Sequence, residues 1–206
     1  LWIRDSSFIN ITSNNFSSNN EAIYLQTSSN NFVTSNTISS NTNFGVYLQD
    51  SCNNVIYNNT LKSQRYGIQL SVGLLSGSNG NNVSMNAATG HWYGFIIDGS
   101  SNNTLSNNTG NNNDVGIYLT EAHNNTILNS VLNGNNYGLW VWVGTNNIIK
   151  NNIIGKSTYG LLFEDGNFST ITQNTFKKNT CGMKFVESYN NSISNNKFIN
   201  NVNDTC

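Results

Sequence analysis

The stretch Gly116-Ile117-Tyr118-Leu119, repeated one period later as Gly138-Leu139-Trp140-Val141, decides the fold of this chain. The same apolar tetrad recurs, with small changes, as Leu1-Trp2-Ile3 (its first residue missing), Ala22-Ile23-Tyr24-Leu25, Gly45-Val46-Tyr47-Leu48, Gly67-Ile68-Gln69-Leu70, Gly94-Phe95-Ile96-Ile97, Gly160-Leu161-Leu162-Phe163 and Gly182-Met183-Lys184-Phe185. Nine units therefore account for all 206 residues. A fixed period of about 22 residues is typical of a solenoid, in which each unit is too small to bury its own apolar face and is stabilised by its neighbours.

Each unit contains three short apolar segments when the first residue of the tetrad is counted as position 0. Positions 1 and 3 are apolar in all nine units, which is the alternation of a strand with one buried face. Positions 11 and 16 are also mostly apolar, as at Ile149 and Ile154. No window keeps the apolar spacing of a helix, which excludes a helical solenoid. We therefore predict an all-β fold: a single-stranded parallel β-helix of about nine 22-residue coils, right-handed because parallel crossovers prefer that hand.

Asparagine recurs at two fixed positions between the apolar segments. It stands at position 9 in seven units and at position 14 in eight. At a bend, an amide side chain tolerates the left-handed conformation, bonds to the turn backbone and stacks on the same amide one coil away. We expect buried asparagine ladders, which satisfy backbone groups that would otherwise lack partners.

One solenoid domain is expected over residues 1–206, with a single large irregularity. The unit that begins at Gly67 is longer than the others, since the next tetrad begins only at Gly94, and this predicts an inserted loop over residues 71–80. Insertions in repeat proteins often gather on the binding face, although a neutral surface insertion is an equal alternative. The sequence begins inside a repeat and without methionine, so we expect it to be a fragment of a longer chain.

The composition excludes two classes of partner. Charged residues make up only 9% of the chain and the formal net charge is −1, so nucleic acid, which requires a basic surface, is not expected. No apolar run approaches the roughly 20 residues that cross a membrane as a helix, so we expect no membrane insertion in this segment.

Two of the three cysteines stand a little more than one period apart. Cys181 directly precedes the last tetrad and Cys206 ends the sequence, so the two would lie in adjacent coils within bridging distance. We predict a disulfide between them and hence an oxidising compartment; two unbonded thiols are the alternative. Cys52 has no partner in this arrangement.

The combination of the apolar tetrad with an Asn-Asn-Thr-Ile run resembles a known repeat. The run stands at Asn124-Asn125-Thr126-Ile127, and variants stand at Asn102-Asn103-Thr104-Leu105 and Asn190-Asn191-Ser192-Ile193. These residues resemble the parallel β-helix repeat of the NosD type, also described as carbohydrate-binding and sugar-hydrolase repeats and common in archaeal surface proteins. The resemblance implies the fold, whereas the function stays open because the same repeat serves lyases, epimerases, copper-site maturation proteins and surface scaffolds.

The copper chemistry that the NosD name implies is not expected here. The only soft or imidazole side chains beside the cysteines are His91, His123, Met85 and Met183, and no two of them stand at neighbouring positions of adjacent units. Copper binding requires such ligands to converge. We therefore expect no metal and no cofactor in the principal interpretation.

Aromatic residues occupy the outward position 2 of several units. The predicted binding residues are Trp2, Tyr24, Tyr47, Tyr118 and Trp140, with Trp142 nearby. Stacked coils would align the first three as one run and Tyr118 with Trp140 as a second pair. Exposed aromatic rings suit sugar rings or a partner protein. The alternative is that they stabilise packing between strands.

Carboxylates gather directly after the first apolar segment. The candidate catalytic residues of an enzymatic alternative are Asp98, Glu121, Glu164, Asp165 and Glu187. Pairs in neighbouring coils would suit the two carboxylates of a glycosidase, or would hold calcium as in β-helical lyases. Among the basic residues, only Lys184 would stand close enough to act with them. We favour a solvated acidic edge over an active site.

The sequence contains ten Asn-x-Ser/Thr sequons, which mark potential glycosylation sites in an exported protein. They begin at Asn10, Asn15, Asn58, Asn82, Asn102, Asn107, Asn124, Asn167, Asn190 and Asn203. Chance is the competing explanation, because a chain rich in asparagine and threonine produces the pattern unavoidably.

These observations favour a non-catalytic scaffold or adhesive module, extracellular or at the cell surface, that would carry glycans and self-associate. Its expected partners are other copies or surface proteins, bound through the aromatic stripe or the open sheet ends, or a polysaccharide. The competing hypothesis is a carbohydrate-active enzyme (a polysaccharide lyase, epimerase or hydrolase) that uses the acidic edge, with calcium as its ion.

Overall fold

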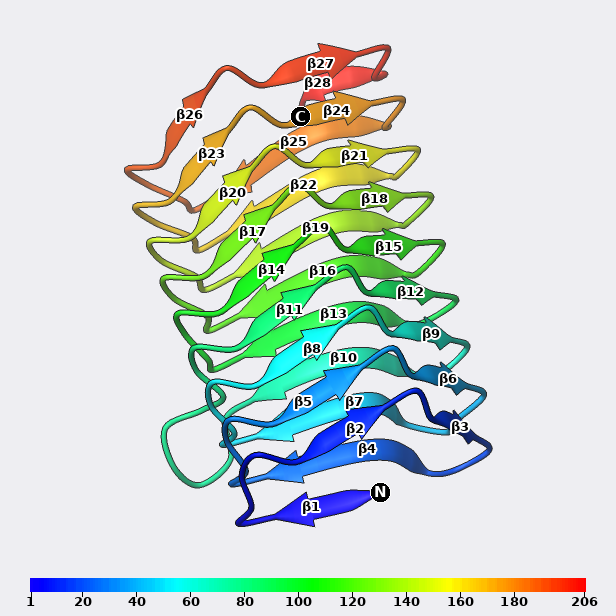
Figure 1. Ribbon diagram of the computed structural model, residues 1–206. Helices are drawn as coiled ribbons and strands as arrows, with labels where there is room; N and C mark the ends of the chain where they lie inside the picture. The colour runs from blue at the N-terminus through cyan, green and yellow to red at the C-terminus, as the bar shows by residue number, and fades with distance from the viewer.

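The structure, a computed structural model that describes residues 1–206, consists of 28 short β-strands and no helix. The strands wind into stacked coils of three strands each (Figure 1). A helix with the length and hydropathy to cross a membrane is accordingly not among its elements. The chain is therefore an all-β solenoid, as the sequence period predicts.

Three parallel sheets form the sides of the coil, and each coil contributes one strand to each sheet. Sheet A contains β1 (Trp2–Arg4), β4 (Glu21–Gln26), β7 (Phe44–Gln49), β10 (Tyr66–Ser71), β13 (Tyr93–Asp98), β16 (Val115–Thr120), β19 (Tyr137–Trp142), β22 (Tyr159–Glu164), β25 (Cys181–Val186) and β28 (Asn203–Thr205). Sheet B contains β2 (Asn10–Thr12), β5 (Phe32–Thr34), β8 (Val55–Tyr57), β11 (Asn82–Ser84), β14 (Thr104–Ser106), β17 (Thr126–Leu128), β20 (Ile148–Lys150), β23 (Thr170–Thr172) and β26 (Ser192–Ser194). Sheet C contains β3 (Asn15–Ser17), β6 (Thr37–Ser39), β9 (Thr60–Lys62), β12 (Ala87–Thr89), β15 (Thr109–Asn111), β18 (Val131–Asn133), β21 (Ile153–Gly155), β24 (Thr175–Lys177) and β27 (Lys197–Ile199).

The register of the sheets follows the sequence repeat. Ile117 pairs with Leu139 and Tyr118 with Trp140, each one repeat further along the chain, in the parallel pairing of β16 with β19. Because equivalent positions lie above one another, every inward residue contacts its counterpart in the next coil. The predicted single-stranded parallel β-helix is confirmed.

A continuous apolar core fills the solenoid. It contains 31 buried residues, drawn from positions 1 and 3 in sheet A, position 11 in sheet B and position 16 in sheet C. Ile127 and Ile149 are fully buried in the middle, whereas Ile193 in the last coil is 49% exposed. The glycine of the tetrad leaves room for the backbone: a Cβ atom on Gly116 would lie 2.5 Å from the carbonyl oxygen of Gly138.

Buried asparagine ladders run along the turns on either side of sheet B. Asn59 is typical: its backbone N–H donates to Asn86 Oδ1 at 2.9 Å, and its Nδ2 donates to the carbonyl oxygen of Val33 at 2.8 Å. In return, Asn59 Oδ1 accepts the backbone N–H of Asn36 at 2.9 Å. One side chain thus satisfies backbone groups of two coils, which is the role expected from the sequence.

Two further polar columns were not expected from the sequence. One, at position 19 before sheet A, consists of Asn19, Asn41, Gln64, His91, Asn113, Asn135, Ser157, Asn179 and Asn201. The other, at position 6 after sheet A, contains Ser28, Ser51, Ser78 and Ser100, each of which donates a hydroxyl hydrogen bond to backbone. Polar side chains therefore bond to the turn backbone at both edges of sheet A as well, although position 6 is Ala122, Gly144 and Gly166 in three of the upper coils and Gln64 Oε1 has no partner.

The longest irregular segment lies between β10 and β11, where a loop protrudes from the edge of the solenoid (Figure 1). The Asp50 carboxylate in the coil below accepts backbone N–H groups from Gly73, Leu74, Leu75 and Gly77 at 2.9–3.2 Å. Burial opposes ionisation of Asp50, but these four bonds outweigh it and hold the pKa of the carboxyl below its ordinary value. Asp50 therefore has a structural role in organising the loop.

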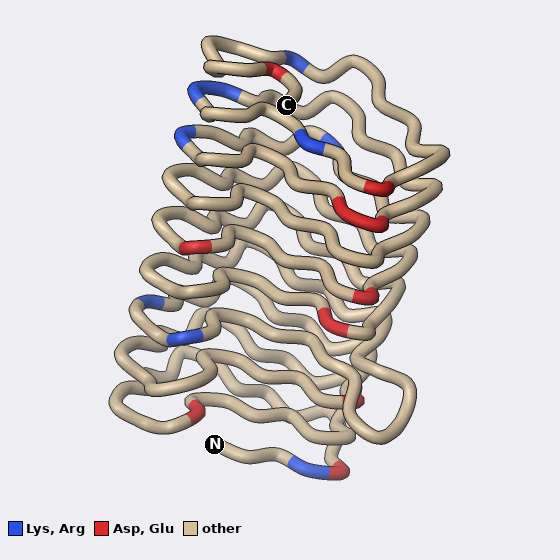
Figure 2. The backbone as a smooth tube through the Cα atoms, turned by 180° about the vertical axis from the view of Figure 1, so that it is seen from behind, with Lys and Arg blue, Asp and Glu red and all other residues tan.

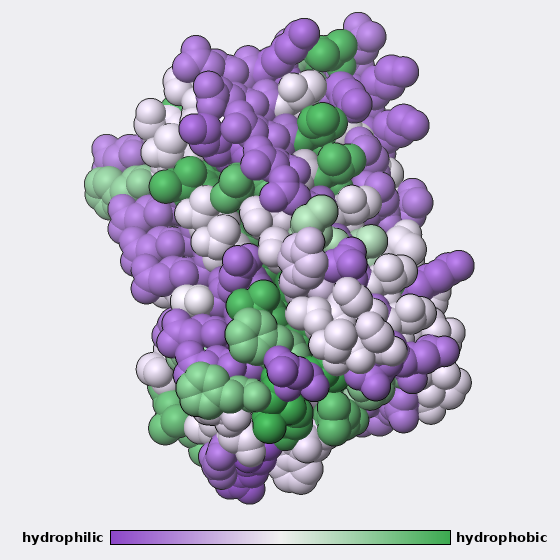
Figure 3. Space-filling model, viewed as in Figure 1, coloured by the Kyte–Doolittle hydropathy of each residue, from purple (hydrophilic) through white to green (hydrophobic).

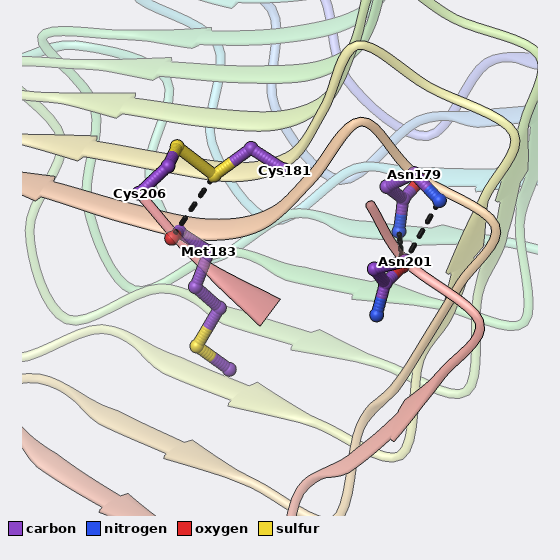
Figure 4. The surroundings of a disulfide bond; sticks show 5 residues. All are labelled: Asn179, Cys181, Met183, Asn201 and Cys206. Atoms are coloured by element: carbon purple, nitrogen blue, oxygen red, sulfur yellow. Dashed lines mark hydrogen bonds between the residues drawn. A yellow bond between two sulfur atoms is a disulfide. The ribbon is translucent and has the colours of Figure 1, made fainter. Parts of the chain in front are cut away.

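A disulfide joins Cys181 to Cys206, with their Cα atoms 6.0 Å apart. Figure 4 shows this bond beside the Asn179–Asn201 rung of the position 19 column, where Asn179 Nδ2 donates to Asn201 Oδ1 at 3.1 Å. The covalent bond and the amide rung together attach the final strand, β28, to β25. The last coil is therefore held at both ends of its sheet A strand.

Candidate functional site

Sheet A carries a continuous ladder of aromatic rings on its outer face. Ten rings follow one another along the solenoid axis, and each lies against the next with ring centroids 4.5–6.1 Å apart. In order they are Trp2, Tyr24, Tyr47, Phe44, Tyr66, Tyr93, Tyr118, Trp140, Tyr137 and Tyr159. Trp142, the remaining predicted residue, is 41% exposed and stacks on none of these rings.

The ladder corrects the expectation of two separate aromatic runs. Five of its rings were not predicted: Phe44, Tyr66, Tyr93, Tyr137 and Tyr159. Each of these five residues stands directly before the first residue, glycine, of its tetrad. Three of them stack on a ring at position 2 of sheet A, in the pairs Phe44–Tyr47, Tyr93–Tyr118 and Tyr137–Trp140, and so connect the two columns of rings. The signal was present in the sequence as a second aromatic column, but cross-column stacking becomes visible only in three dimensions.

Most of the ladder serves packing between coils. Tyr24 and Tyr47 lie with centroids 4.9 Å apart and planes inclined by 21°, and Tyr137 and Tyr159 are inclined by only 8°. Neighbouring rings therefore cover one another's faces and turn their edges to solvent. A flat ligand finds few uncovered faces on such a stack, so the geometry favours the packing alternative along most of sheet A.

The ladder leaves one groove open, because two adjacent coils in its middle lack a ring at position 2. Gln69 pairs in register with Tyr47, and Ile96 pairs with Tyr118, so shorter side chains stand where the flanking coils carry tyrosine. The resulting groove, which we call the notch, has a volume of about 380 Å³. Its lining residues are Phe44, Tyr66, Gln69, Tyr93, Ile96, Asp98, Tyr118 and Thr120.

Polar groups occupy one side of the notch and aromatic rings the other. Asp98 Oδ2 accepts the hydroxyl hydrogen of Ser71 at 2.7 Å, which fixes the carboxylate at the end of β13. Burial raises the pKa of Tyr47 and of Tyr118, and the negative charge of Asp98 adds to both shifts. Both phenols therefore remain neutral hydrogen-bond donors well above neutral pH. Tyr118 lines the notch itself, and Tyr47 stacks on its lining residue Phe44.

The five candidate catalytic carboxylates lie along one edge of the solenoid but have separate surroundings. Several acidic residues mark this edge, from which the long loop also protrudes (Figure 2). Asp98 lines the notch, whereas Glu164 Oε2 accepts the indole N–H of Trp140 at 2.8 Å. The other three, Glu121, Asp165 and Glu187, are exposed at turn positions with φ of 47–51°.

The basic residue expected beside these carboxylates lies elsewhere. Lys184 Nζ is 5.6 Å from the ring centroid of Tyr159, over the last ring of the ladder. No three histidine, cysteine, aspartate or glutamate side chains lie close enough together to hold a metal ion. The acidic edge therefore contains no converging set of acid, base and ion ligands.

The outer faces of sheets B and C carry no comparable feature. Their surface is largely hydrophilic over the upper coils, and apolar side chains gather lower on the visible face (Figure 3). Of the ten sequon asparagines, nine are exposed and Asn167 is half-buried. Nine lie in sheets B and C or in the turns around sheet B, and only Asn203 lies in sheet A. In the coils that form the notch, every sequon therefore lies away from the sheet A face.

Two family models match this chain. The model described as "Periplasmic copper-binding protein (NosD)" matches residues 71–205, and the model described as "Right handed beta helix region" matches residues 1–110. Each match covers more than half of the chain. They confirm the resemblance inferred from the repeat and the predicted right-handed sense of the coil.

The side chains do not fit the copper site that the first description names. His91 is buried among the polar residues before sheet A, with Nδ1 3.0 Å from a backbone carbonyl oxygen. His123 lies in a turn of another coil, Met85 is exposed, and Met183 is packed in the core. These donors are spread over different coils, whereas a copper site requires them to converge.

Solved structures with the same architecture include enzymes that act on alginate. The A-module of the mannuronan C-5 epimerase AlgE6 from Azotobacter vinelandii superposes with a TM-score of 0.77 at 17% identity, covering 96% of this chain and 57% of that one. The periplasmic alginate epimerase AlgG gives 0.77 at 17% identity, covering 96% and 50%. An alginate lyase from Paenibacillus sp. gives 0.65 at 13% identity, covering 88% and 76%.

These likenesses show the fold alone, because the identities are 17% or less. This chain spans about half the length of the two epimerases. The comparison with curated proteins gave no match.

Proposed function

The chain belongs to the NosD family of right-handed β-helix proteins, and from that premise we propose that it is a non-catalytic adhesive module that binds carbohydrate in the notch. The observation that carries the proposal is the gap in the column of position 2 rings at Gln69 and Ile96, which the ladder bypasses through Tyr66 and Tyr93. That interruption creates the one recess of sheet A in which polar and aromatic groups meet.

The lining of the notch suits a sugar. A ring edge carries a partial positive charge, so the edges of Tyr66 and Tyr93 favour the lone pairs of sugar hydroxyl groups. Gln69 and Asp98 supply an amide and a carboxylate at the opposite side. Several solved β-helices that resemble this fold are described as acting on alginate, which supports a saccharide ligand for this architecture.

The distribution of carboxylates supports binding without catalysis. Glycosidases require two carboxyl groups that face one bond of the substrate at about 5–9 Å. Here Asp98 is hydrogen-bonded to Ser71, and Glu164 is hydrogen-bonded to Trp140. The exposed Glu121, Asp165 and Glu187 stand in the following turns. A glycosidase would need a second carboxyl group facing Asp98, and the notch lining contains none.

An exported location agrees with this role. The family description names the periplasm, and the disulfide between Cys181 and Cys206 requires an oxidising compartment. We propose an extracellular, cell-surface or periplasmic module. Glycans on the exposed sequons would surround sheet B and leave the notch accessible. The rigid solenoid would hold the notch at a fixed position, and its open ends or Trp142 would contact other copies.

The proposal is tested by closing the notch. Gln69→Tyr would place a ring in the floor of the notch, at a position that already carries tyrosine in the coil directly below. Isothermal titration against a panel of neutral and acidic oligosaccharides should show binding to the native chain and at least a tenfold loss for the variant. Thermal unfolding should change little.

Thr126→Tyr, an outward substitution on sheet B, is the matched control and should bind as the native chain does. Absence of glycan binding by the native chain would overturn the proposal. So would release of reducing or unsaturated sugar that disappears in Asp98→Ala or Asp165→Ala, because that outcome supports the enzyme.

A further inference from the structure

We infer that the notch selects an uncharged sugar with adjacent hydroxyl groups over a uronate. This inference rests on the proposed function, since it names the class of carbohydrate that the same site would take. It departs from the alginate-acting proteins that share the fold, because alginate carries a carboxylate on every residue. The basis is the charge and the unsatisfied polar atoms of the lining.

Asp98 is the one charged residue that lines the notch. Its side chain is half-buried, so its negative charge is screened less than that of a surface carboxylate. The four lining aromatics add no positive charge, because neither phenylalanine nor tyrosine carries one. A uronate placed in the notch would therefore bring a second negative charge close to Asp98 with no cation among the lining residues to balance it. Such like-charge contact is a means of rejecting a ligand.

The cations of the sheet A face are not among the residues that line the notch. Arg65, the nearest of them, covers the ring of the lining residue Tyr66 at 5.2 Å from its centroid, and its guanidinium lies closer still, at 4.5 Å, to the ring centroid of Trp92. Arg4 pairs with Asp5 at 3.3 Å in the first coil, and Lys184 lies over Tyr159 in the upper coils. None of the three lines the notch.

The polar atoms that remain unpaired in the notch match a diol. Asp98 Oδ2 accepts from Ser71, whereas Oδ1 has no hydrogen-bond partner in the protein. The Gln69 side chain also forms no hydrogen bond within the protein, so its amide offers both donors and an acceptor. A carboxylate accepts hydrogen bonds from two neighbouring hydroxyls, and an amide completes the set.

The size of the notch limits the ligand to a short stretch of sugar. Its volume of about 380 Å³ lies near the lower end of the range for small-molecule sites. The groove is bounded along the solenoid axis by Phe44 and Tyr118. One or two sugar rings would therefore occupy it, while the rest of a longer chain would extend over the outside of the ladder.

The experiment compares neutral and acidic oligosaccharides of equal length. Hexasaccharides of glucose, mannose and galactose are titrated against the native chain by calorimetry, together with hexamers of mannuronic and galacturonic acid. At least one neutral hexamer should bind at least tenfold more tightly than both uronates. Because the discrimination arises from charge, it should shrink when the salt concentration is raised.

Asp98→Asn removes the charge and keeps an oxygen that accepts from Ser71. This variant should reduce the preference for the neutral sugar at least fivefold, mainly by improving uronate binding. Lys150→Gln, an exposed change of charge in β20 of sheet B, is the control, and it should leave the preference unchanged.

Tighter binding of a uronate than of every neutral hexamer, or an unchanged preference in Asp98→Asn, overturns this inference while leaving the proposed carbohydrate binding intact. Failure of every oligosaccharide to bind overturns both.

Discussion

The interior of the solenoid and the outer face of sheet A are built from the same coils, but residue identity is repeated in the interior and changes along the outer face. Inward positions repeat: Ile127, Ile149 and Ile171 follow one another in sheet B with no exposed surface. Outward position 2 of sheet A instead changes from tyrosine to Gln69 and Ile96 before tyrosine returns at Tyr118. Each inward residue must fit the coils on both sides, whereas an outward residue is limited mainly by its neighbours on the face. The interior therefore maintains the fold, and the outer face is where a site can be shaped.

The largest expected effect comes from placing a charge in the interior. Ile149→Asp would bury a carboxylate without a partner in the middle of the core, and should lower the free energy of unfolding by about 4–5 kcal/mol or more. Thermal unfolding followed by circular dichroism measures the loss. Ile148→Asp, at the next position but 43% exposed, is the control and should change stability by no more than about 0.5 kcal/mol. If both substitutions lowered the free energy of unfolding equally, inward positions would not be more restricted than outward ones, and the comparison would be wrong.

A smaller effect should follow the loss of one rung of an amide ladder. Asn59→Ala would leave the backbone N–H of Asn36 and the carbonyl of Val33 buried without these partners, at a cost of about 3 kcal/mol. Denaturant unfolding provides the measurement. Asn82→Ala, in β11, removes an exposed amide from a strand position and should be nearly neutral. If Asn59→Ala also left the free energy of unfolding unchanged, the amide ladders would not contribute to the stability of the interior.

The smallest effect concerns His91. In the position 19 column this residue has a titratable imidazole ring, where most other coils have an amide side chain. Burial is the main reason that the pKa of His91 lies below its usual 6.5. The unfolded chain therefore takes up a proton before the folded chain does, and stability should fall as the pH decreases below about 6.5, by at most about 1.4 kcal/mol per pH unit. His91→Asn should remove this part of the pH dependence in melting curves between pH 7 and pH 5. A variant that keeps the full dependence would show that other groups produce it.

The fold followed from the sequence because its signals are periodic. The apolar columns and the asparagines at positions 9 and 14 repeat with little variation, and each predicted column corresponds to one line of contacts. The column at position 19 was harder to recognise, since Gln64, His91 and Ser157 interrupt it and one extra residue near Thr42 shifts the spacing. Chemical identity varies in this column, while the hydrogen bonds to the backbone are retained.

The candidate site was only partly predictable for a different reason. Tyr47 and Tyr118 were identified as outward aromatics, but the notch is defined by Gln69 and Ile96, where the aromatic pattern is missing. A search for repeated residues does not detect the positions at which the repeat stops. Asp98 was identified as an acidic candidate, and its contact with Ser71 depends on the pairing of β10 with β13.

The loop over residues 72–81 enters between two coils without disturbing them: Leu70 remains paired with Ile97 and Val83 with Leu105. Strand pairing on both sides is therefore insensitive to the length of this connection, and Asp50 anchors it close to its base. Peptides of other lengths grafted in place of Leu74 and Leu75 should be displayed on an unchanged framework, over the recess that these two residues share with Arg4, Gln26 and Asp50. The solenoid therefore offers an insertion site whose content can be exchanged without redesigning the coils that support it.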